Sequence, residues 1–282
     1  MQDLTLIIPA KNESESLPIF LGEIQQLDCK KKIILDKNDK KTLDSISHMK
    51  DIEIFFQQKK GFGSALIEGI NDTDTEFFCI INSDGSMDPK YLNQMFENIK
   101  VKELDFIFAT RYEKPGGGSD DDNLITLIGN YIFTKIGNIF FSLNLSDILY
   151  TYVMGRTKSF NNLEVISNDF TFCVELPIKV KKQNVKYGTL PSHERVRIAG
   201  TKKVNALKDG FLILVKMVKL FFRAQRKLFF WANCFSCARA RSWRDPEAGM
   251  FFSCAGMQSG ARSAPRIFRY FVSRSSGISL GN

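Results

Sequence analysis

The side chains best suited to chemistry in this sequence gather in a polar turn, residues 82–86, which reads Asn-Ser-Asp-Gly-Ser. The turn directly follows the apolar run "FFCII", residues 77–81. Its amide, hydroxyl and carboxylate groups could contact a polar ligand at the end of a buried strand. Asp, Gly and Ser are also common turn formers, because their local hydrogen bonds and backbone freedom suit tight bends. The meaning of Asp84 therefore depends on what the rest of the chain brings beside it.

The elements that would position this turn are short apolar runs separated by stretches with helical patterning. The runs are "LTLIIP" (4–9), "KKIILD" (31–36), "IEIFFQ" (52–57), "FFCIIN" (77–82) and "DFIFATR" (105–111), and helix-like stretches include 15–27 and 63–71. Strands that alternate with helices are typical of a doubly wound, mostly parallel sheet. The expected fold class is α/β, with a Rossmann-like, mostly parallel sheet flanked by helices.

In such a sheet, ligands bind beyond the carboxyl ends of the strands. Residues 9–13, Asp36, Asp84 and Arg111 each come directly after or at the end of a predicted strand. We therefore expect them to lie along one edge of the sheet.

Composition narrows the class of partner without naming it. The formal net charge is +8 and the pI is near 9.1, a balance that favours an anionic partner such as nucleic acid, a phosphorylated small molecule or an anionic membrane surface. The six cysteines are irregularly spaced, and the first residues lack a signal-peptide pattern, so a reducing cytoplasm is the simpler setting. The sequence has no run of 18 uncharged apolar residues, so we do not expect a membrane-spanning helix. Peripheral contact with a bilayer stays open.

Three segments outside the alternating pattern carry separate expectations. Residues 123–152 are apolar and predict helices that cover the sheet or face lipid, with a buried helix favoured. Before them, the loop "RYEKPGGGSDDDN" (111–123) is expected to be mobile. Residues 193–227 pass from a basic strand or loop into an amphipathic helix, which could lie in a membrane interface through Lys216 and Lys219 or pack on the domain.

The last 54 residues, 229–282, differ in composition from everything before them. They contain seven arginines, three cysteines and no lysine. We therefore expect one domain over residues 1–228, ending in the amphipathic helix, and an Arg/Cys/Ser-rich tail over 229–282 that is not part of the fold. The pair "CFSC" (234–237) has metal or redox spacing, but no second pair or nearby histidine completes a site.

Several motifs in register resemble family 2 glycosyltransferases, and most closely their dolichol-phosphate (polyprenyl-phosphate) mannosyltransferase branch. They are "LTLIIPAKNESESLP", "QQKKGFGSALIEGI", "INSDGSMDP", "ATRY" and "ERVRIAGTKKVNALKDG", which together cover about residues 4–226. The resemblance implies a GT-A type fold over residues 1–228. It also implies an enzyme that transfers a sugar with inversion at the anomeric carbon.

The resemblance assigns expected roles to particular residues. Asp84 and Arg111 would be the catalytic pair, with Arg111 facing the donor diphosphate or the acceptor phosphate. Residues expected to bind substrate are Pro9, Ala10, Asn12, Glu13, Asp36, Gly61, Arg197 and Lys203. Less specific matches are Gly63, Asp147, Glu175, Arg195 and Lys202. Asn12 and Glu13 could equally cap the following helix, since both residue types suit a helix start.

The turn 82–86 matches the family's Asp-x-Asp motif, with Asn82 in place of the first acid. In the family this motif holds Mg²⁺ or Mn²⁺ against the donor diphosphate, so the expected protein ligands here are Asn82, Asp84 and Ser86. A hard cation manages with one or two carboxylates when phosphates and water supply the remaining ligands. Asp84 is therefore expected to be the essential acid.

The resemblance thus predicts transfer from a nucleotide-sugar donor to a polyprenyl-phosphate acceptor, in a cytoplasmic protein at the inner face of an anionic membrane, with no nucleic-acid partner. Two alternatives stay open. One is transfer to a saccharide hydroxyl in surface-polysaccharide biosynthesis. The other is a non-catalytic module that binds a nucleotide sugar or lipid, in which Asn82 marks lost chemistry.

Overall fold

The computed structural model describes residues 1–200, 205 and 207–223. Residues 1–217 form one compact unit, and residues 218–282 form a second. The expected tail, the pair 234–237, Lys202 and Lys203 lie outside the described residues. The expected boundary at residue 228 stays a prediction, and the description below concerns the first unit.

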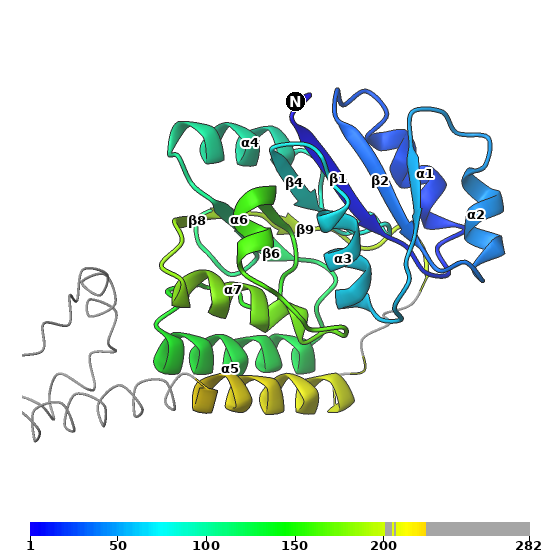
Figure 1. Ribbon diagram of the computed structural model, residues 1–282. Helices are drawn as coiled ribbons and strands as arrows, with labels where there is room; N and C mark the ends of the chain where they lie inside the picture. The colour runs from blue at the N-terminus through cyan, green and yellow to red at the C-terminus, as the bar shows by residue number, and fades with distance from the viewer. Residues whose placement is uncertain (201–204, 206, 224–282) are drawn as a thin grey trace, which may run out of the picture. The chain divides into compact units, whose positions relative to one another are not determined.

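The first unit is built on a seven-stranded sheet with the order β3-β2-β1-β4-β7-β5-β8 (Figure 1). The strands are β1 (Leu4–Pro9), β2 (Lys30–Leu35), β3 (Glu53–Phe56), β4 (Phe77–Ile80), β5 (Phe106–Thr110), β7 (Val153–Arg156) and β8 (Tyr187–Pro191). Within this sheet β7 alone runs antiparallel to its neighbours, β4 and β5. The mostly parallel α/β sheet predicted from the sequence is thus confirmed, and β7 and β8 are additions that the apolar runs did not indicate.

Helices cover both faces of the sheet. They are α1 (Ser16–Glu23), α2 (Lys40–Ile46), α3 (Phe62–Asn71), α4 (Tyr91–Val101), α6 (Thr157–Asn162) and α7 (Phe172–Lys182). The apolar sides of α1 and α4 pack on alternate residues of β1, Leu4, Leu6 and Ile8, in one large core cluster. Helix α3 packs on the opposite face, where its Gly69 lies against Ile7 and Ile34. Strands covered on both faces read as nearly continuous apolar runs, which is why the sequence pattern was so clear.

Helix α5 (Leu124–Phe141) is not the buried helix that was favoured from the sequence. Only Asn130, Thr134 and Gly137 of its 18 residues are buried. The exposed apolar side chains of α5 are Leu124, Ile125, Leu127, Ile128, Tyr131, Ile132, Ile139 and Phe140. The expectation failed because apolar composition cannot distinguish a core from another apolar environment, and α5 covers other helices rather than the sheet. Among the described residues, α5 is the one helix long and apolar enough to cross a membrane.

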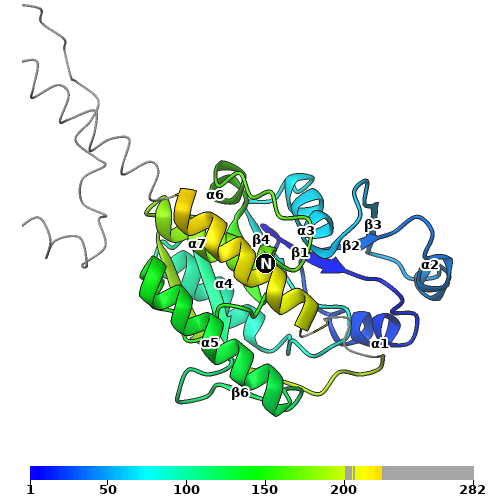
Figure 2. The same cartoon turned by 90° about the horizontal axis from the view of Figure 1, so that it is seen from below.

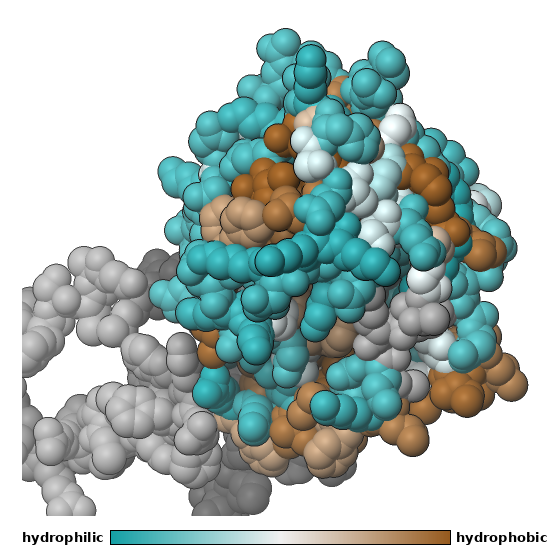
Figure 3. Space-filling model, turned by 90° about the vertical axis from the view of Figure 1, so that its right-hand side faces the viewer, coloured by the Kyte–Doolittle hydropathy of each residue, from teal (hydrophilic) through white to brown (hydrophobic). Residues whose placement is uncertain are grey.

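A further helix spans residues 207–223, and its part within the first unit packs beside α5 and α7 (Figures 1 and 2). Gly210 lies near the ring of Phe133 on α5, and Lys216 forms an ion pair of 3.0 Å with Glu175 on α7. The Lys216 side chain is only 16% exposed, so it serves packing on the domain rather than a membrane interface. Leu207, Phe211, Leu212 and Leu214 remain exposed. Figure 3 shows apolar surface along the lower edge of the molecule, at the level of these helices in Figure 1.

The start of α3 lies unusually close to the backbone of the segment 167–169. The Ser64 N–H donates to the Asn168 carbonyl at 3.1 Å. A Cβ atom added at Gly63 would lie 2.1 Å from the Ser167 carbonyl oxygen, and one at Gly61 would lie 2.0 Å from the Asn168 oxygen. Gly61 and Gly63 were expected to allow close approach of a nucleotide. In the structure they allow close approach of the protein's own segment 167–169.

We predict that Gly63→Ala destabilises the protein by about 1–3 kcal/mol, because the added Cβ atom and the Ser167 carbonyl oxygen would lie too close and must move apart. Gly22→Ala is the matched control, since nothing lies within 4 Å of a Cβ at Gly22. Urea unfolding of both variants measures the difference. Equal stability of the two variants would show that the 167–169 segment shifts freely.

Candidate functional site

A cavity of about 650 Å³ opens at the carboxyl ends of the strands. It is lined by all of the described residues that the sequence analysis assigned to catalysis, substrate or metal, namely Pro9, Ala10, Asn12, Glu13, Asp36, Gly61, Asn82, Asp84, Ser86, Arg111 and Arg197. Lys203 lies outside the described residues. The prediction that these residues lie together at one edge of the sheet is therefore confirmed. Their roles stay predictions.

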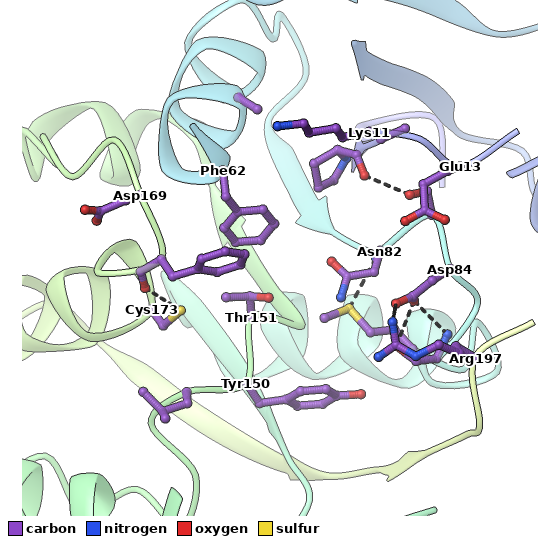
Figure 4. A pocket seen from close by; sticks show the side chains of 18 of the residues that line it. Lys11, Glu13, Phe62, Asn82, Asp84, Tyr150, Thr151, Asp169, Cys173 and Arg197 are labelled. Atoms are coloured by element: carbon purple, nitrogen blue, oxygen red, sulfur yellow. Dashed lines mark hydrogen bonds and ion pairs between the residues drawn. The ribbon is translucent and has the colours of Figure 1, made fainter. Parts of the chain in front are cut away.

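The turn 82–86 is held in shape by its own hydrogen bonds. The Asp84 Oδ1 atom accepts from the Ser86 backbone N–H at 3.1 Å and from the Ser86 hydroxyl at 2.8 Å. Ser86 is buried, and Asn82 faces the middle of the cavity (Figure 4). The Ser86 hydroxyl thus orients the carboxylate of Asp84, and its lone pairs remain available as oxygen donors.

The segment after β9 (His193–Glu194) lies along this turn. The Arg195 N–H donates to the Ser86 carbonyl and the Ile198 N–H to the Asp84 carbonyl, both at 2.8 Å. This pairing brings the guanidinium of Arg197 to 3.5 Å from the Asp84 carboxylate and 2.7 Å from that of Asp121. Figure 4 shows Asp84 and Arg197 facing one another at one end of the cavity. A carboxylate and a guanidinium at one end of a cavity can together bind a cation and a phosphate.

Arg195 differs from Arg197 although only one residue separates them. Its guanidinium donates to the Gly85 carbonyl at 2.7 and 3.0 Å and pairs with Glu23 at 2.8 Å. It does not line the cavity. Residues 195–197 have no regular strand geometry, and within this segment Arg197 faces the cavity whereas Arg195 stabilises the turn from behind.

Arg111 is buried in a cluster of carboxylates on the cavity wall. Asp147 accepts from its Nε and Nη2 atoms at 2.7 and 3.2 Å, and Glu194 and Asp122 accept from Nη1 at 3.0 and 3.3 Å. These carboxylates hold the guanidinium of Arg111 in the cavity wall, and its predicted contact with a phosphate stays a prediction. Asp147 therefore orients a basic residue, Arg111.

The same cluster shifts the titration of its members. Burial alone would lower the pKa of Arg111, but the charges of Asp147 and Glu194 outweigh it and raise the pKa well above the usual value. Burial raises the pKa of Glu194, and the positive charge of Arg111 offsets part of that rise. The Arg111 guanidinium also lies 4.6 Å from the ring centre of Tyr150, a cation–π contact.

Another part of the predicted site lies at the ends of β1 and β2. The Asn12 N–H donates to Asp39 at 2.6 Å, and the Glu13 carboxylate accepts from the Ser16 hydroxyl at 2.5 Å. Glu13 therefore contacts the first side chain of α1 while it also lines the cavity, but its carboxylate does not cap a backbone N–H of that helix. The backbone N–H of Asn38 lowers the pKa of Asp36, whose carboxylate is exposed. An ionised acceptor at this position suits hydrogen bonds from a sugar or base.

Sequence reasoning missed the acidic part of the loop 111–123. This loop was expected to be mobile, yet Asp120 lies 2.7 Å from His193, Asp121 pairs with Arg197, and Asp122 pairs with Arg111. A short two-stranded sheet, β6 (Gly118–Ser119) with β9, adds backbone pairing. Three consecutive acids followed later by alternating basic residues were the available signal. Their pairing could not be read from the sequence because the two segments are far apart along the chain.

Cavity residues outside the predicted set include two stacked rings. Phe62 and Phe170 lie 4.9 Å apart between ring centres, near Asp169 and Cys173 (Figure 4). Lys11 and Lys60 also line the cavity. The cavity thus has an apolar end and a charged end, with Asn82 and Thr151 between them.

The turn 82–86 has the donor chemistry of a hard-cation site. Asp84 supplies the carboxylate, and Asn82 and Ser86 supply neutral oxygens. Within the described part of the chain, no group of three or more His, Cys, Asp or Glu side chains is arranged to hold a metal ion. A cation here would consequently depend on phosphate and water for most of its ligands.

Comparisons with known proteins agree with this geometry. The model of glycosyl transferase family 2 matches residues 5–164. Uncharacterized glycosyltransferases of Mycobacterium tuberculosis (strain H37Rv) and Mycobacterium bovis are each 28% identical to the chain over 102 residues, which cover 36% of this chain and 44% of the relative. The chain thus matches less than half the length of these relatives.

Two solved structures share the fold. Mannosyl-3-phosphoglycerate synthase from Rubrobacter xylanophilus has a TM-score of 0.60 at 16% identity, with 79% of this chain and 75% of that chain covered. Glucosyl-3-phosphoglycerate synthase from Mycobacterium tuberculosis, in complex with Mn²⁺, uridine diphosphate and glucosyl-3-phosphoglycerate, has a TM-score of 0.60 at 9% identity, with 77% and 79% covered. The predicted GT-A fold is confirmed by these likenesses.

The two arginines of the site should differ in what their loss does. We predict that Arg111→Met destabilises the protein by about 3–5 kcal/mol, because it leaves buried carboxylates without their cation. Arg197→Met should cost about 1–2 kcal/mol, since its partners are closer to solvent, but should weaken nucleoside diphosphate binding about tenfold. Urea unfolding and calorimetric titration measure the two effects. The reverse order of stabilities would contradict the scaffold role of Arg111.

Proposed function

Because the chain belongs to glycosyl transferase family 2, we propose that it transfers a sugar from a nucleotide-diphosphate donor to a polyprenyl phosphate. The observation that carries the proposal is the convergence of residues 9–13, Asp36, the turn 82–86 and Arg197 on one cavity. Such a cavity offers carboxylate acceptors for a nucleoside, and it also offers a carboxylate and a guanidinium for a diphosphate.

In this proposal the donor lies across the carboxyl ends of β1, β2 and β4. Asp36 and Glu13 accept hydrogen bonds from the base or ribose, and residues 9–12 shape the turn beneath them. Arg197 contacts the diphosphate, because its guanidinium is partly exposed and already lies beside Asp84. Lys203 would add a second cation near the phosphates.

The residues of the turn 82–86 fit the Mg²⁺ or Mn²⁺ that the family implies. Asp84 would hold the ion, with the amide oxygen of Asn82 and the hydroxyl of Ser86 as further donors. When bound, the ion would offset negative charge on the departing diphosphate. Asn82 carries no charge, so affinity for the ion alone should be weak until the donor supplies its phosphates.

A polyprenyl phosphate is supported as acceptor by two features of the molecule. A phosphate monoester is largely ionised at neutral pH and needs no general base, so its attack requires only positioning. The exposed apolar face of α5 belongs to the same unit as the cavity. Such a face is more stable in contact with lipid than with water. The protein would then act at the inner face of an anionic membrane, with α5 as the contact.

A second candidate acceptor is a small phosphorylated acid. The structures named above with the same fold include synthases of mannosyl- and glucosyl-3-phosphoglycerate, so the fold itself accommodates that class. Transfer to a hydroxyl, whether of such an acid or of a saccharide, requires a general base. Asp169, a carboxylate of the cavity wall, is the candidate for that role.

We predict that incubation with a panel of nucleotide sugars and a polyprenyl phosphate releases nucleoside diphosphate from one donor and yields a lipid-linked sugar. The measurement is diphosphate release together with mass analysis of the organic phase. A sugar found only on phosphoglycerate or on a saccharide would replace the lipid acceptor with the second class. Binding of donor without any transfer would favour a non-catalytic module.

The metal assignment predicts opposite effects of two substitutions in the turn. Asp84→Ala should abolish Mn²⁺-dependent donor binding, whereas Asn82→Asp should tighten Mn²⁺ binding by about 1 kcal/mol, because repulsion from Asp84 limits the gain from the added charge. Titration of Mn²⁺ at fixed nucleotide measures both. Asp74→Ala, an exposed acid paired with Lys30, is the control. Unchanged binding in Asp84→Ala would reduce the motif to a structural turn.

A further inference from the structure

A second cavity, of about 620 Å³, lies along helix α5. Its walls include the apolar side chains of Leu127, Ile128 and Leu145 and the ring of Tyr131. Lys135 is the one charged residue among those that line it. Its lining and shape therefore suit an apolar ligand better than a nucleotide or a sugar.

The floor of this second cavity contains an unsatisfied polar group. The Ser146 Oγ atom is buried and has no hydrogen-bond partner. Buried hydroxyls are nearly always paired, so an unpaired one beside a cavity points to a ligand or water that occupies the space. Thr134 and Asn138 also line the second cavity, but both are already hydrogen-bonded to the backbone and leave the apolar side chains to contact a ligand.

The second cavity shares a wall with the first. Tyr112 lines the second cavity, and its hydroxyl donates to Asp122 and accepts from the Asn130 amide, both of which line the first. On α5, Thr126 lines the first cavity and the next residue, Leu127, lines the second. A single layer of side chains therefore separates the two cavities.

The second cavity also continues into the exposed apolar face of α5. Leu127 is 43% exposed, Ile128 50% and Tyr131 62%, so its outer rim is open rather than sealed by protein. Leu124 and Ile125 extend the apolar surface toward the helix start. A ligand longer than the second cavity could thus run from it along α5 and out to an apolar phase.

We propose that the second cavity holds the apolar chain of the phosphorylated lipid acceptor, with the phosphate in the first cavity. The proposal rests on the proposed function, since it assigns the chain of that acceptor to a place. A bilayer lipid or a second copy of this protein could cover the same surface. The shared wall favours the acceptor, because it places the apolar chain directly beside the cavity that would hold the phosphate.

The test measures binding rather than transfer. Calorimetry measures the titration of farnesyl phosphate into three full-length proteins: wild type, Ile128→Asn and Ile132→Asn. Ile132 is the matched control, since it lies on the same helix and is 48% exposed but does not line the second cavity. We expect Ile128→Asn to weaken farnesyl phosphate about tenfold through lost apolar contact, and Ile132→Asn to change it less than about twofold.

Further ligands distinguish lost contact with the lipid chain from lost phosphate binding and from misfolding of the protein. Inorganic phosphate and nucleoside diphosphate should bind Ile128→Asn as they bind wild type, and farnesol should retain the sensitivity to Ile128→Asn. Ser146→Leu, which fills the cavity from its other wall, should weaken farnesyl phosphate in a protein whose thermal unfolding remains cooperative.

Three results would overturn the proposal, and they differ in what else they remove. Equal binding by wild type and Ile128→Asn overturns the chain site and leaves the proposed function intact. Nucleoside diphosphate binding without any farnesyl phosphate binding removes the lipid acceptor as well. A dimer in light scattering that Ile128→Asn dissociates would identify the surface as an interface between copies.

Discussion

The ion pairs of one buried guanidinium connect the parts of the chain that form the cavity wall. Arg111 follows directly after β5, and its carboxylate partners come from the loop before α5, from the segment between α5 and β7, and from β9. Removing charges from water is costly, and the cost is recovered only when every partner is in place. The cluster therefore makes the positions of these segments interdependent.

That interdependence extends to the charged end of the cavity. Glu194, a partner of Arg111, opens the segment whose backbone pairs with the turn 82–86 and whose Arg197 reaches Asp84. Asp121, next to the Arg111 partner Asp122, holds the other side of Arg197. A single electrostatic arrangement thus positions the carboxylate, the guanidinium and the loop that surround the candidate diphosphate site. Catalytic groups held in this way can act without first reorganising.

Helix α5 connects that arrangement to the outer surface. Its N-terminal half borders both cavities, while its outward face leaves many large apolar side chains in contact with solvent. Exposed apolar surface on this scale is unfavourable in water and signals an apolar partner. The same helix therefore contributes to the wall of a polar reaction site and to a surface suited to lipid, which fits an enzyme that joins a water-soluble donor to an amphiphilic acceptor.

The sequence by itself determined the mostly parallel α/β sheet and the edge where residues 9–13, Asp36, Asp84 and Arg111 gather. It did so because strand patterning and strand ends are local properties of the chain. Only the tertiary structure decided that Arg111 binds carboxylates, that Gly61 and Gly63 admit the segment 167–169, and that α5 is exposed. These outcomes depend on contacts between residues distant in the sequence, where charge pairing and close packing are settled by which segments the fold brings together.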